Sequence, residues 1–390
     1  MKPFIPEKLP IRNVNWEALA PLIGAANSNL SLYNGILEAI PNPHILLSPM
    51  TTKEAVLSSQ IEGTQASLSE VLEFEAGEEN TTKRNDIDEV MNYRRAMIEA
   101  ENMFKHRPFI HLNMLKALHY ILLSGVRGKD KARGEFRTEQ NWIGPRGTPM
   151  EQATYVPPPP EQLIDLLTNW ENYINDDQQE TMVQMGFLHA QFELIHPFLD
   201  GNGRMGRMLL PLYLYQKKKL RYPVFYLSEY FEKNRDEYYE KLKGISKNGD
   251  WQSWIEFFLR AIKEQSTINC NKARNIMALY EQSKKDFREA THSQFTLDLL
   301  DALFKNPITN ASILQRNSGI EKMVTINYLL NKLAEAGLIS ISNIFSNLFD
   351  LITFFKHSSF LQIYAPLPFF FPIKSISIFF SGVLTILNNS

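Results

Sequence analysis

The stretch His196–Arg207, HPFLDGNGRMGR, brings together residue types whose chemistry fits one site. Two glycines flank Asn202 and allow the backbone to turn with its N–H groups facing one way, which forms a nest for anions. A helix predicted to begin near Arg204 adds its positive N-terminal end at the same place. Arg204 and Arg207 lie three residues apart on one face of this helix, and guanidinium groups suit phosphate oxygens. The stretch therefore predicts a cradle for a polyphosphate.

An imidazole and a carboxylate stand beside this cradle. Asp200 next to a phosphate site is the usual means of holding Mg²⁺, which keeps several waters and bridges phosphate oxygens. His196 can accept a proton from an attacking hydroxyl, because the ordinary pKa of histidine lies near the working pH. The set indicates nucleotidyl or phosphoryl transfer onto a hydroxyl. His189 lies seven residues earlier on the same helical face, and we expect it to be a core histidine.

The whole chain sets broad limits on the class of protein. Its 390 residues are enough for two or three domains with a sizeable core, and its formal charge of -2 favours no nucleic-acid partner. The lone cysteine, Cys270, cannot form an internal disulfide, which fits a reducing compartment. The first twenty residues lack the apolar core of a signal peptide, and prolines interrupt every long apolar run. We expect a cytoplasmic protein without membrane segments.

Apolar periodicity predicts a mainly α fold that positions the twelve residues. The helical pattern runs from Trp16 to Met103 and resumes near His111, and a predicted helix over 181–195 leads directly into His196. Residues 126–160 are rich in glycine and end in four prolines, which excludes a helix. We expect them to form an exposed flap with a short hairpin around Gly147.

A compact unit is predicted over residues 291–342. Its three short helical stretches have the spacing of a winged type of helix-turn-helix, with Gly337 as a plausible C-cap. The unit carries four basic and four acidic side chains. Because DNA binding depends on neutralising phosphates, this balance favours a packing or dimerisation role over DNA contact.

The last residues, 343–390, differ in composition from the rest. They hold ten of the 25 phenylalanines but only three charged residues, and prolines break the apolar runs. A membrane-surface tail and a partner-binding tail are open alternatives. We favour an apolar end that packs poorly and carries no chemistry.

The sequence resembles the Fic family. Residues 196–207 match every position of the Fic signature, His-x-Phe-x-(Asp/Glu)-Gly-Asn-Gly-Arg-x-x-Arg, and the resemblance extends over roughly 15–340. The stretch GEFRTEQNWIG at 134–144, followed by ATYVPPPP, resembles the flap on which Fic proteins dock their targets. The segment 222–242 resembles the helix that completes the adenine pocket, with Tyr238 and Leu242 near the base. Residues 291–342 resemble a C-terminal winged helix, whereas the tail departs from the family pattern.

The resemblance implies protein AMPylation, in which AMP moves from ATP to a Ser, Thr or Tyr hydroxyl of a target protein. His196 would deprotonate the hydroxyl and Asp200 would hold Mg²⁺. The residues implied in nucleotide binding are Gly201, Asn202, Gly203, Arg204, Met205, Gly206 and Arg207. Arg207 would hold the γ-phosphate, and the flap would pair with the target backbone.

An upstream stretch, SSQIEG at 58–63, matches the (Ser/Thr)-x-x-x-Glu-(Gly/Asn) motif of the Fic inhibitory helix, with Ser58, Glu62 and Gly63 at its fixed positions. Taken alone it is an ordinary helix end. In the family context, Glu62 would pair with Arg207 and so compete with the γ-phosphate for the same guanidinium.

These observations predict a mainly α protein: a Fic-domain helical bundle with a short β-hairpin flap, plus a small winged-helix-like module. The predicted parts are an N-terminal helical region at 1–105, a Fic core at 106–285 with its flap near 141–160, the module at 291–342 and the tail at 343–390. The predicted function is an ATP- and Mg²⁺-dependent protein adenylyltransferase inhibited by Glu62. The alternatives are a nucleotide-sensing DNA-binding regulator, a pure scaffold, and a Fic enzyme that moves or removes another phosphate-linked group. Self-modification and a homodimer stay open.

Overall fold

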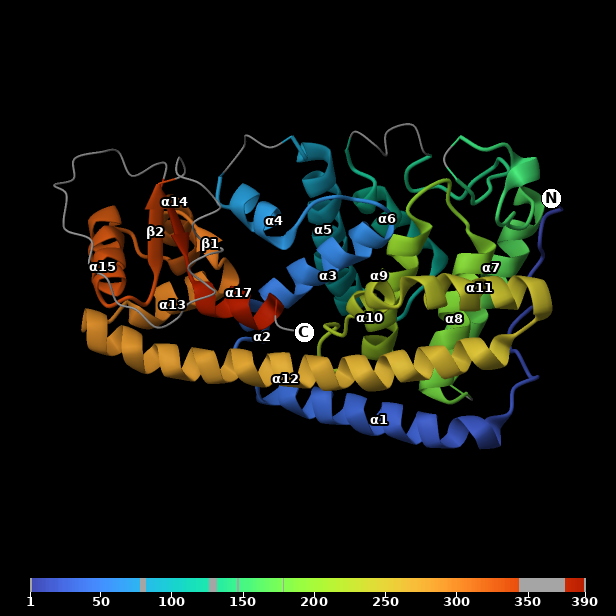
Figure 1. Ribbon diagram of the computed structural model, residues 1–390, viewed down its shortest axis with the longest axis horizontal. Helices are drawn as coiled ribbons and strands as arrows, with labels where there is room; N and C mark the ends of the chain where they lie inside the picture. Colours follow the sequence, from blue (N-terminus) through green and yellow to red (C-terminus); the bar gives the residue numbers. More distant parts are fainter. Residues whose placement is uncertain are drawn as a thin grey trace. The chain divides into compact units, whose positions relative to one another are not determined.

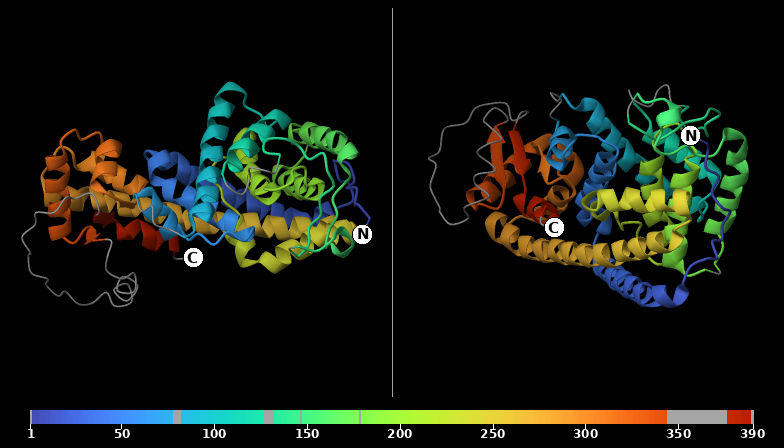
Figure 2. Two further views of the ribbon diagram at one scale, coloured as in Figure 1. Left: turned by 90° about the horizontal axis from the view of Figure 1, so that it is seen from above. Right: turned by 45° about the vertical axis from the view of Figure 1, so that its right-hand side comes forward.

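The computed structural model describes residues 2–77, 82–125, 132–145, 147–177, 179–343 and 376–388 (Figure 1). The chain divides into two compact units. The first unit is formed by residues 1–71 and 81–275, and the second by residues 72–80 and 276–389. The long helix α12 (Trp251–Thr291) is continuous and contributes its first part to one unit and its second part to the other (Figure 2).

Helices make up the first unit, which confirms the mainly α prediction. Beside the first part of α12, they are α1 (Trp16–Ala39), α2 (Pro43–Leu46), α3 (Ser48–Ile61), α5 (Arg84–His106), α6 (Leu112–Leu122), α7 (Leu163–Ile174), α8 (Thr181–Ile195), α9 (Asn202–Gln216), α10 (Ser228–Lys233), α11 (Arg235–Asn248) and the short 3₁₀ turns η1 (Met150–Gln152) and η2 (Pro160–Gln162). None of the described helices is both long and apolar enough to cross a membrane.

Helix α8 lies at the centre of this unit. Thirteen of its fifteen residues are buried, as expected for a helix that is covered on all sides. Trp170 of α7 donates a hydrogen bond to the Leu188 carbonyl at 2.9 Å, and Trp254 of α12 donates to the Gly186 carbonyl at 2.8 Å. A side chain at Gly186 would meet Ile255 at 2.8 Å, so glycine allows α12 to pack closely. These contacts fix the helix that leads into His196.

The flap forms the hairpin expected around Gly147, but with little strand. Ile143 and Tyr155 form an isolated antiparallel bridge, with hydrogen bonds from Ile143 N to Tyr155 O at 2.8 Å and from Tyr155 N to Ile143 O at 3.1 Å. Between them the chain makes turns and the short η1. The bridge leaves Trp142 and Ile143 largely exposed, so the apolar surface of the flap faces solvent.

The second unit combines helices with a small sheet. Its elements include α13 (Thr296–Lys305), β1 (Ile308–Thr309), α14 (Ala311–Ser318), α15 (Met323–Glu335), β2 (Ser340–Asn343), β3 (Ile376–Phe379) and α17 (Ser381–Asn388), while α4 (Leu68–Glu75) has residues in both units. The sheet has the order β1-β3-β2, and both pairs are antiparallel. In the register, Ile341 faces Ile378 and Ile308 faces Phe379. The order of helices and strands is compatible with a winged-helix-like module, which stays a prediction.

The expectation that residues 343–390 pack poorly is wrong for residues 376–388. Strand β3 lies between β1 and β2, and the side chains of Ile378, Phe380, Val383 and Leu387 are buried. These four side chains therefore belong to the core of the second unit. Residues 344–375 lie outside the described part of the chain, so the other expectations for the tail are untested there.

Candidate active site

The signature forms a tight turn between α8 and α9. Helix α8 ends at Ile195, and its C-cap residue His196 has a left-handed backbone with φ 49° and ψ 61°. The Asn202 side chain closes the turn, because its Oδ1 accepts from Phe198 N at 2.9 Å and its Nδ2 donates to Phe198 O at 2.8 Å. Gly201 has φ 78°, a value that favours glycine, and α9 begins at the next residue. The N-terminus of α9 therefore opens onto the predicted cradle.

A histidine that the sequence analysis missed supports this turn. His119 of α6 is fully buried and stacks on Phe198 with ring centroids 3.7 Å apart. Its Nδ1 accepts from Gly134 N at 3.0 Å, so Nε2 carries the proton and donates to Asp200 O at 3.0 Å. Burial lowers the pKa of His119 to about 4, which keeps the ring neutral. His119 thus fixes the backbone of the residue that carries the signature carboxylate.

His196 has the tautomer that a general base needs. Its Nδ1 lies 3.2 Å from the Glu193 carbonyl, and a carbonyl can only accept, so Nδ1 carries the proton. The lone pair of Nε2 is therefore available to take a proton. Burial lowers the pKa of His196 to about 4, so the ring is neutral at neutral pH.

Asp200 and Arg204 lie next to each other at the start of α9. The Asp200 Oδ1 accepts from Gly201 N at 2.6 Å and lies 3.6 Å from Arg204 Nη2. Arg204 also lies 3.4 Å from Glu89, and its Nε is buried without a hydrogen-bond partner among the residues that the structure describes. The Asp200 side chain keeps 42% exposure, so a metal on a bound nucleotide can reach it.

The donor set fits Mg²⁺ only in the form that nucleotides bring. The described residues contain no group of three or more His, Cys, Asp or Glu side chains placed to hold a metal. Mg²⁺ in nucleotide sites keeps several waters and binds one or two carboxylates together with phosphate oxygens. Asp200 supplies such a carboxylate beside the cradle.

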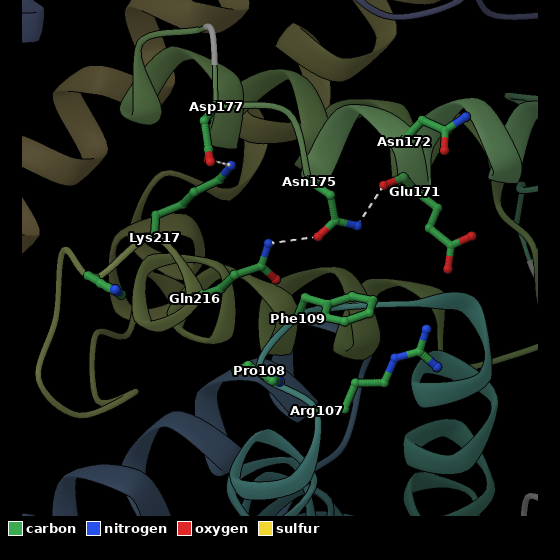
Figure 3. A pocket seen from close by; sticks show the side chains of 10 residues that line it. Arg107, Pro108, Phe109, Glu171, Asn172, Asn175, Asp177, Gln216 and Lys217 are labelled. Atoms are coloured by element: carbon green, nitrogen blue, oxygen red, sulfur yellow. Dashed lines mark hydrogen bonds and ion pairs between the residues drawn. The ribbon is translucent and has the colours of Figure 1, made fainter.

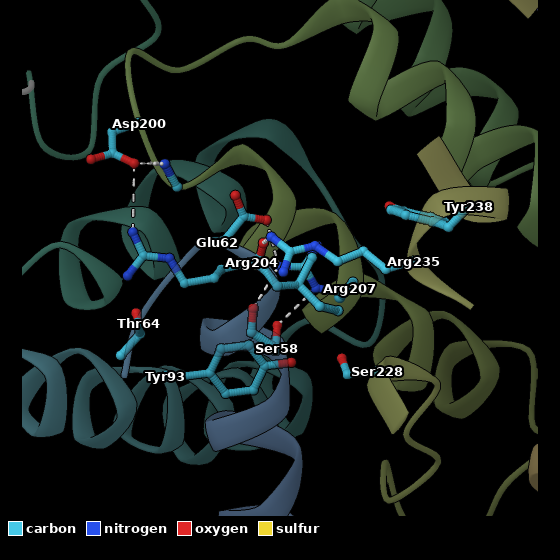
Figure 4. A network of polar contacts seen from close by, with 12 residues as sticks. Ser58, Glu62, Thr64, Tyr93, Asp200, Arg204, Arg207, Ser228, Arg235 and Tyr238 are labelled. Atoms are coloured by element: carbon cyan, nitrogen blue, oxygen red, sulfur yellow. Dashed lines mark hydrogen bonds and ion pairs between the residues drawn. The ribbon is translucent and has the colours of Figure 1, made fainter. Parts of the chain in front are cut away.

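The second arginine of the signature is occupied by the upstream motif. Arg207 Nη2 donates to Glu62 Oε1 at 2.7 Å and to the Ser58 carbonyl at 2.7 Å, and Arg207 Nε donates to Ser58 Oγ at 2.9 Å. Figure 4 shows these contacts between α3 and α9. Arg207 is only 2% exposed, whereas the Glu62 side chain is 35% exposed. Both fixed polar positions of the 58–62 motif therefore contact one guanidinium.

Charge keeps this pair ionised. Partial burial alone would raise the pKa of Glu62, but the Arg207 guanidinium lowers it below its usual value. Burial would lower the pKa of Arg207, but Glu62 holds it above its usual value. A Cβ atom at Gly203 would lie 2.0 Å from Glu62 Oε1, so the carboxylate fills the space that the missing side chain leaves over the cradle.

Helix α3, which leads into Glu62, is held at its C-terminus and along one face. Near its C-terminus, Arg235 of α11 donates to the Ile61 carbonyl at 2.6 Å, and Gly63 then turns the chain with φ 95°. One face of α3 buries Glu54, which accepts from the Ser228 hydroxyl at 2.5 Å. Burial raises the pKa of Glu54 to about 8, so this acid is mostly neutral at neutral pH.

The residue before Glu54 in α3, Lys53, forms an ion pair with Glu229 of α10 at 2.7 Å. Lys272 of α12 forms a second ion pair with the same carboxylate, also at 2.7 Å. The position of Glu62 is thus set by contacts with several neighbouring helices.

Comparison with known proteins agrees with this geometry. Residues 20–102 match the family described as Fic/DOC family N-terminal, and residues 109–214 match the Fic/DOC family. The chain therefore contains an N-terminal region and a domain of the Fic/DOC family. The first match covers α3 and the 58–63 motif, and the second covers the flap and the signature.

Curated relatives with similar sequences are Fic proteins of insects. The chain is 27% identical over 173 residues to "Protein adenylyltransferase Fic" of Drosophila mojavensis, a match that covers 44% of this chain and 31% of that protein. It is 28% identical over 174 residues to the protein of the same name from Culex quinquefasciatus, covering 44% of this chain and 30% of that protein. The matches span less than a third of the length of these relatives, so their named activity comes to this chain only as a proposal.

Solved Fic structures share the fold. A Fic family protein from Desulfovibrio desulfuricans G20 aligns with a TM-score of 0.55 at 19% identity, covering 88% of this chain and 94% of that chain. A Fic domain containing signaling protein from Bacteroides thetaiotaomicron VPI-5482 aligns with a TM-score of 0.52 at 15% identity, covering 64% of this chain and 97% of that chain. At these identities the likeness concerns the fold alone.

Of the two adenine-pocket residues expected in this Fic domain, Tyr238 is buried, and the place of Leu242 near the base stays a prediction. Tyr238 of α11 is 1% exposed, stacks on Phe231, and its hydroxyl lies 3.0 Å from Nε2 of the buried His189. It belongs to the aromatic core and is not presented to a ligand, whereas its neighbour Tyr239 is 44% exposed. Leu242, one turn further along α11, is half-buried. His189 is a core histidine, as predicted.

Met205 and Gly206 of the Fic signature serve the packing of α9. Met205 is fully buried. A Cβ atom at Gly206 would lie 2.4 Å from Glu193 Oε1, so glycine makes room for this side chain of α8. These two residues therefore shape the helix that carries Arg204 and Arg207.

A separate polar groove of about 890 Å³ lies away from the Fic signature (Figure 3). Its lining residues come from the segment after α5, from α7 and from the end of α9, and they include Arg107, Phe109, Asn175 and Lys217. No residue of the signature or of the 58–63 motif lines it. Its volume alone therefore does not mark it as the site of the chemistry.

Proposed function

We propose that this chain is a protein adenylyltransferase that transfers AMP from ATP to a Ser, Thr or Tyr hydroxyl of a target protein. The observation that carries the proposal is the Nδ1 contact of His196 with the Glu193 carbonyl, which leaves Nε2 available as a base in the turn that leads into Gly201–Gly203. The names of the insect relatives support the same reaction.

The proposed reaction follows from the positions of these residues. The target hydroxyl attacks the α-phosphorus, its proton passes to His196 Nε2, and the bond from the α-phosphorus to the oxygen that bridges to the β-phosphate breaks. Pyrophosphate leaves, and a phosphodiester joins AMP to the target. The backbone N–H groups at the start of α9 and the Arg204 guanidinium would stabilise charge on the phosphates. Mg²⁺ on Asp200 would neutralise phosphate charge and orient the leaving group.

We propose that Glu62 holds this activity in check. Arg207 would bind the γ-phosphate in the productive pose of ATP, and its guanidinium now donates to Glu62 and Ser58. ATP can then bind only in another pose or after Glu62 moves aside. The competition needs no change in the fold, because Glu62 follows the last residue of α3 and its side chain is partly exposed.

Labelled ATP distinguishes this function from related reactions. Glu62→Gly protein, a lysate and ATP labelled on the α-phosphate should yield labelled proteins, whereas ATP labelled on the γ-phosphate should yield none. Label from the γ-phosphate alone would indicate phosphoryl transfer. Release of AMP from previously modified proteins without new labelling would favour the alternative that this Fic enzyme removes the group.

A further inference from the structure

One buried cation near the candidate site has no role in the chemistry described so far. Arg137 lies between α6 and the flap bridge and is only 2% exposed. Its guanidinium donates to four main-chain carbonyls: Nε to His196 O at 2.9 Å, Nη1 to Glu139 O at 3.2 Å, and Nη2 to Pro158 O at 2.5 Å and to Ile195 O at 3.4 Å. Its backbone N–H donates to Pro197 O at 2.9 Å.

Two of these carbonyls, those of Ile195 and His196, lie at the C-terminal end of α8. The last carbonyls of a helix have no partner within the helix, and Pro197 prevents the helix from continuing. His196 is held in a left-handed conformation that residues other than glycine adopt at a cost, and such a conformation persists only where the surroundings enforce it. Arg137 binds the carbonyls on both sides of the His196 backbone N–H, at Ile195 and at His196 itself.

The other two carbonyls belong to the flap. Glu139 precedes the Ile143–Tyr155 bridge, and Pro158 follows it. Two other hydrogen bonds join the flap to the same turn: Tyr155 donates to Leu194 O at 2.6 Å, and Asn141 donates to Phe198 O at 3.0 Å. Arg137 thus contacts both flanks of the bridge and the backbone of His196. Burial lowers the pKa of its guanidinium to about 10, so it still carries its charge at neutral pH.

We infer that Arg137 is a positioning residue that couples the flap to His196, so that a target docked on the flap meets the base in register. This inference rests on the proposed adenylyl transfer. The planar guanidinium directs its donors to several carbonyls at once, whereas a lysine ammonium is a single point with a flexible stem. Arg137 contacts none of the cradle residues in the hydrogen bonds above, so its effect should appear in turnover and in the KM for the target, and ATP affinity should stay the same.

The test uses full-length protein carrying Glu62→Gly, with Arg137→Lys or Arg137→Ala added. A matched control is Gln184→Ala, because Gln184 is also buried and donates to two main-chain carbonyls, those of Tyr173 and Asp176, away from the site. We expect Arg137→Lys to lower kcat by about tenfold to hundredfold, as a small misplacement of a catalytic group does. ATP affinity measured by calorimetry should not change.

If Gln184→Ala lowered Tm and kcat as much as Arg137→Lys does, Arg137 would only stabilise the fold, and the inference would be overturned. An unchanged kcat in Arg137→Lys would overturn it as well. Hydrogen exchange gives a readout without activity: Arg137→Lys should speed exchange of the Ile143, Tyr155 and His196 amides, and Gln184→Ala should not. If the Glu62→Gly parent transfers no AMP, the proposed function fails, and the exchange result still decides whether Arg137 couples the two segments.

Discussion

Replacing Glu62 by glycine should raise the activity of the protein, although removal of a charged group from an active site usually lowers it. The Glu62 carboxylate has no role in the proposed mechanism. Its Oε1 lies 2.7 Å from Arg207 Nη2 and so keeps this guanidinium from the γ-phosphate. Hydrogen bonds that involve charged groups contribute about 1.5–3 kcal/mol net. Because the Glu62 side chain is 35% exposed, solvent screens the ion pair, and we take the lower end of this energy range for the contact.

A competing contact of about 1.5 kcal/mol corresponds to a rate difference of about tenfold. We therefore expect Glu62→Gly to raise AMP incorporation about tenfold or more at saturating ATP and Mg²⁺, measured as α-phosphate label on protein over time. Glu62→Gln is the matched variant, since it keeps the length and an acceptor oxygen but loses the charge, and its activity should lie between those of the other two proteins.

The double variant Glu62→Gly with Arg207→Ala should lose the gain, because the freed guanidinium is the group that the γ-phosphate needs. If Glu62→Gly were no more active than the wild-type protein under these conditions, the competition argument would be refuted, and residues 58–63 would be a helix end without a regulatory role.

Asp200→Ala should need far more Mg²⁺ for any remaining transfer, and an unchanged Mg²⁺ titration curve would show that this carboxylate is not the metal ligand. Because burial lowers the pKa of His196 to about 4, the base stays unprotonated through mildly acidic pH, so a pH–rate profile of Glu62→Gly should show no loss from this group between neutral pH and about pH 5; a limb near 6.5 would contradict this. The folded-state pKa of Glu54 is raised to about 8, so its contribution to stability is complete below its unfolded value of 4.5 and declines as pH rises toward 8. Glu54→Gln should therefore flatten the fall of Tm with pH over that range, and an equally steep fall would place the titrating group elsewhere.

The local parts of the site could be predicted from the sequence. Residues 196–207 are contiguous, so the turn at Gly201 and the helix that follows are set by neighbours in the chain. The pairing of Glu62 with Arg207 joins residues 145 apart in sequence, and only the resemblance to the family motif indicated it.

Supports contributed by distant segments could not be predicted. His119 contacts the backbone of Asp200 across 81 residues, and Arg137 contacts that of His196 across 59 residues, and a lone buried histidine or arginine has no local pattern that reveals its partner. Tyr238 shows a related limit. The helix was predicted, but adjacent residues on a helix point in directions about 100° apart, so Tyr238 faces the core while Tyr239 is exposed.

The C-terminal segment shows the same difficulty in the fold. Strand β3 pairs with β2 across the intervening residues 344–375 and also with β1, and its own composition gave no sign of these partners. Strand pairing depends on the partner strand as much as on local propensity. Short apolar runs between prolines are therefore poor evidence for an unpacked end.

The role of His196 as the base for adenylyl transfer can be measured with purified Glu62→Gly protein, its own chain or a lysate as the acceptor, and ATP labelled on the α-phosphate. Adding His196→Ala should reduce label on the acceptor by about hundredfold or more, as loss of a general base does, while ATP still binds with the affinity of the parent protein. Retention of most of the labelling in the His196→Ala variant, with ATP binding intact, would contradict the proposed mechanism.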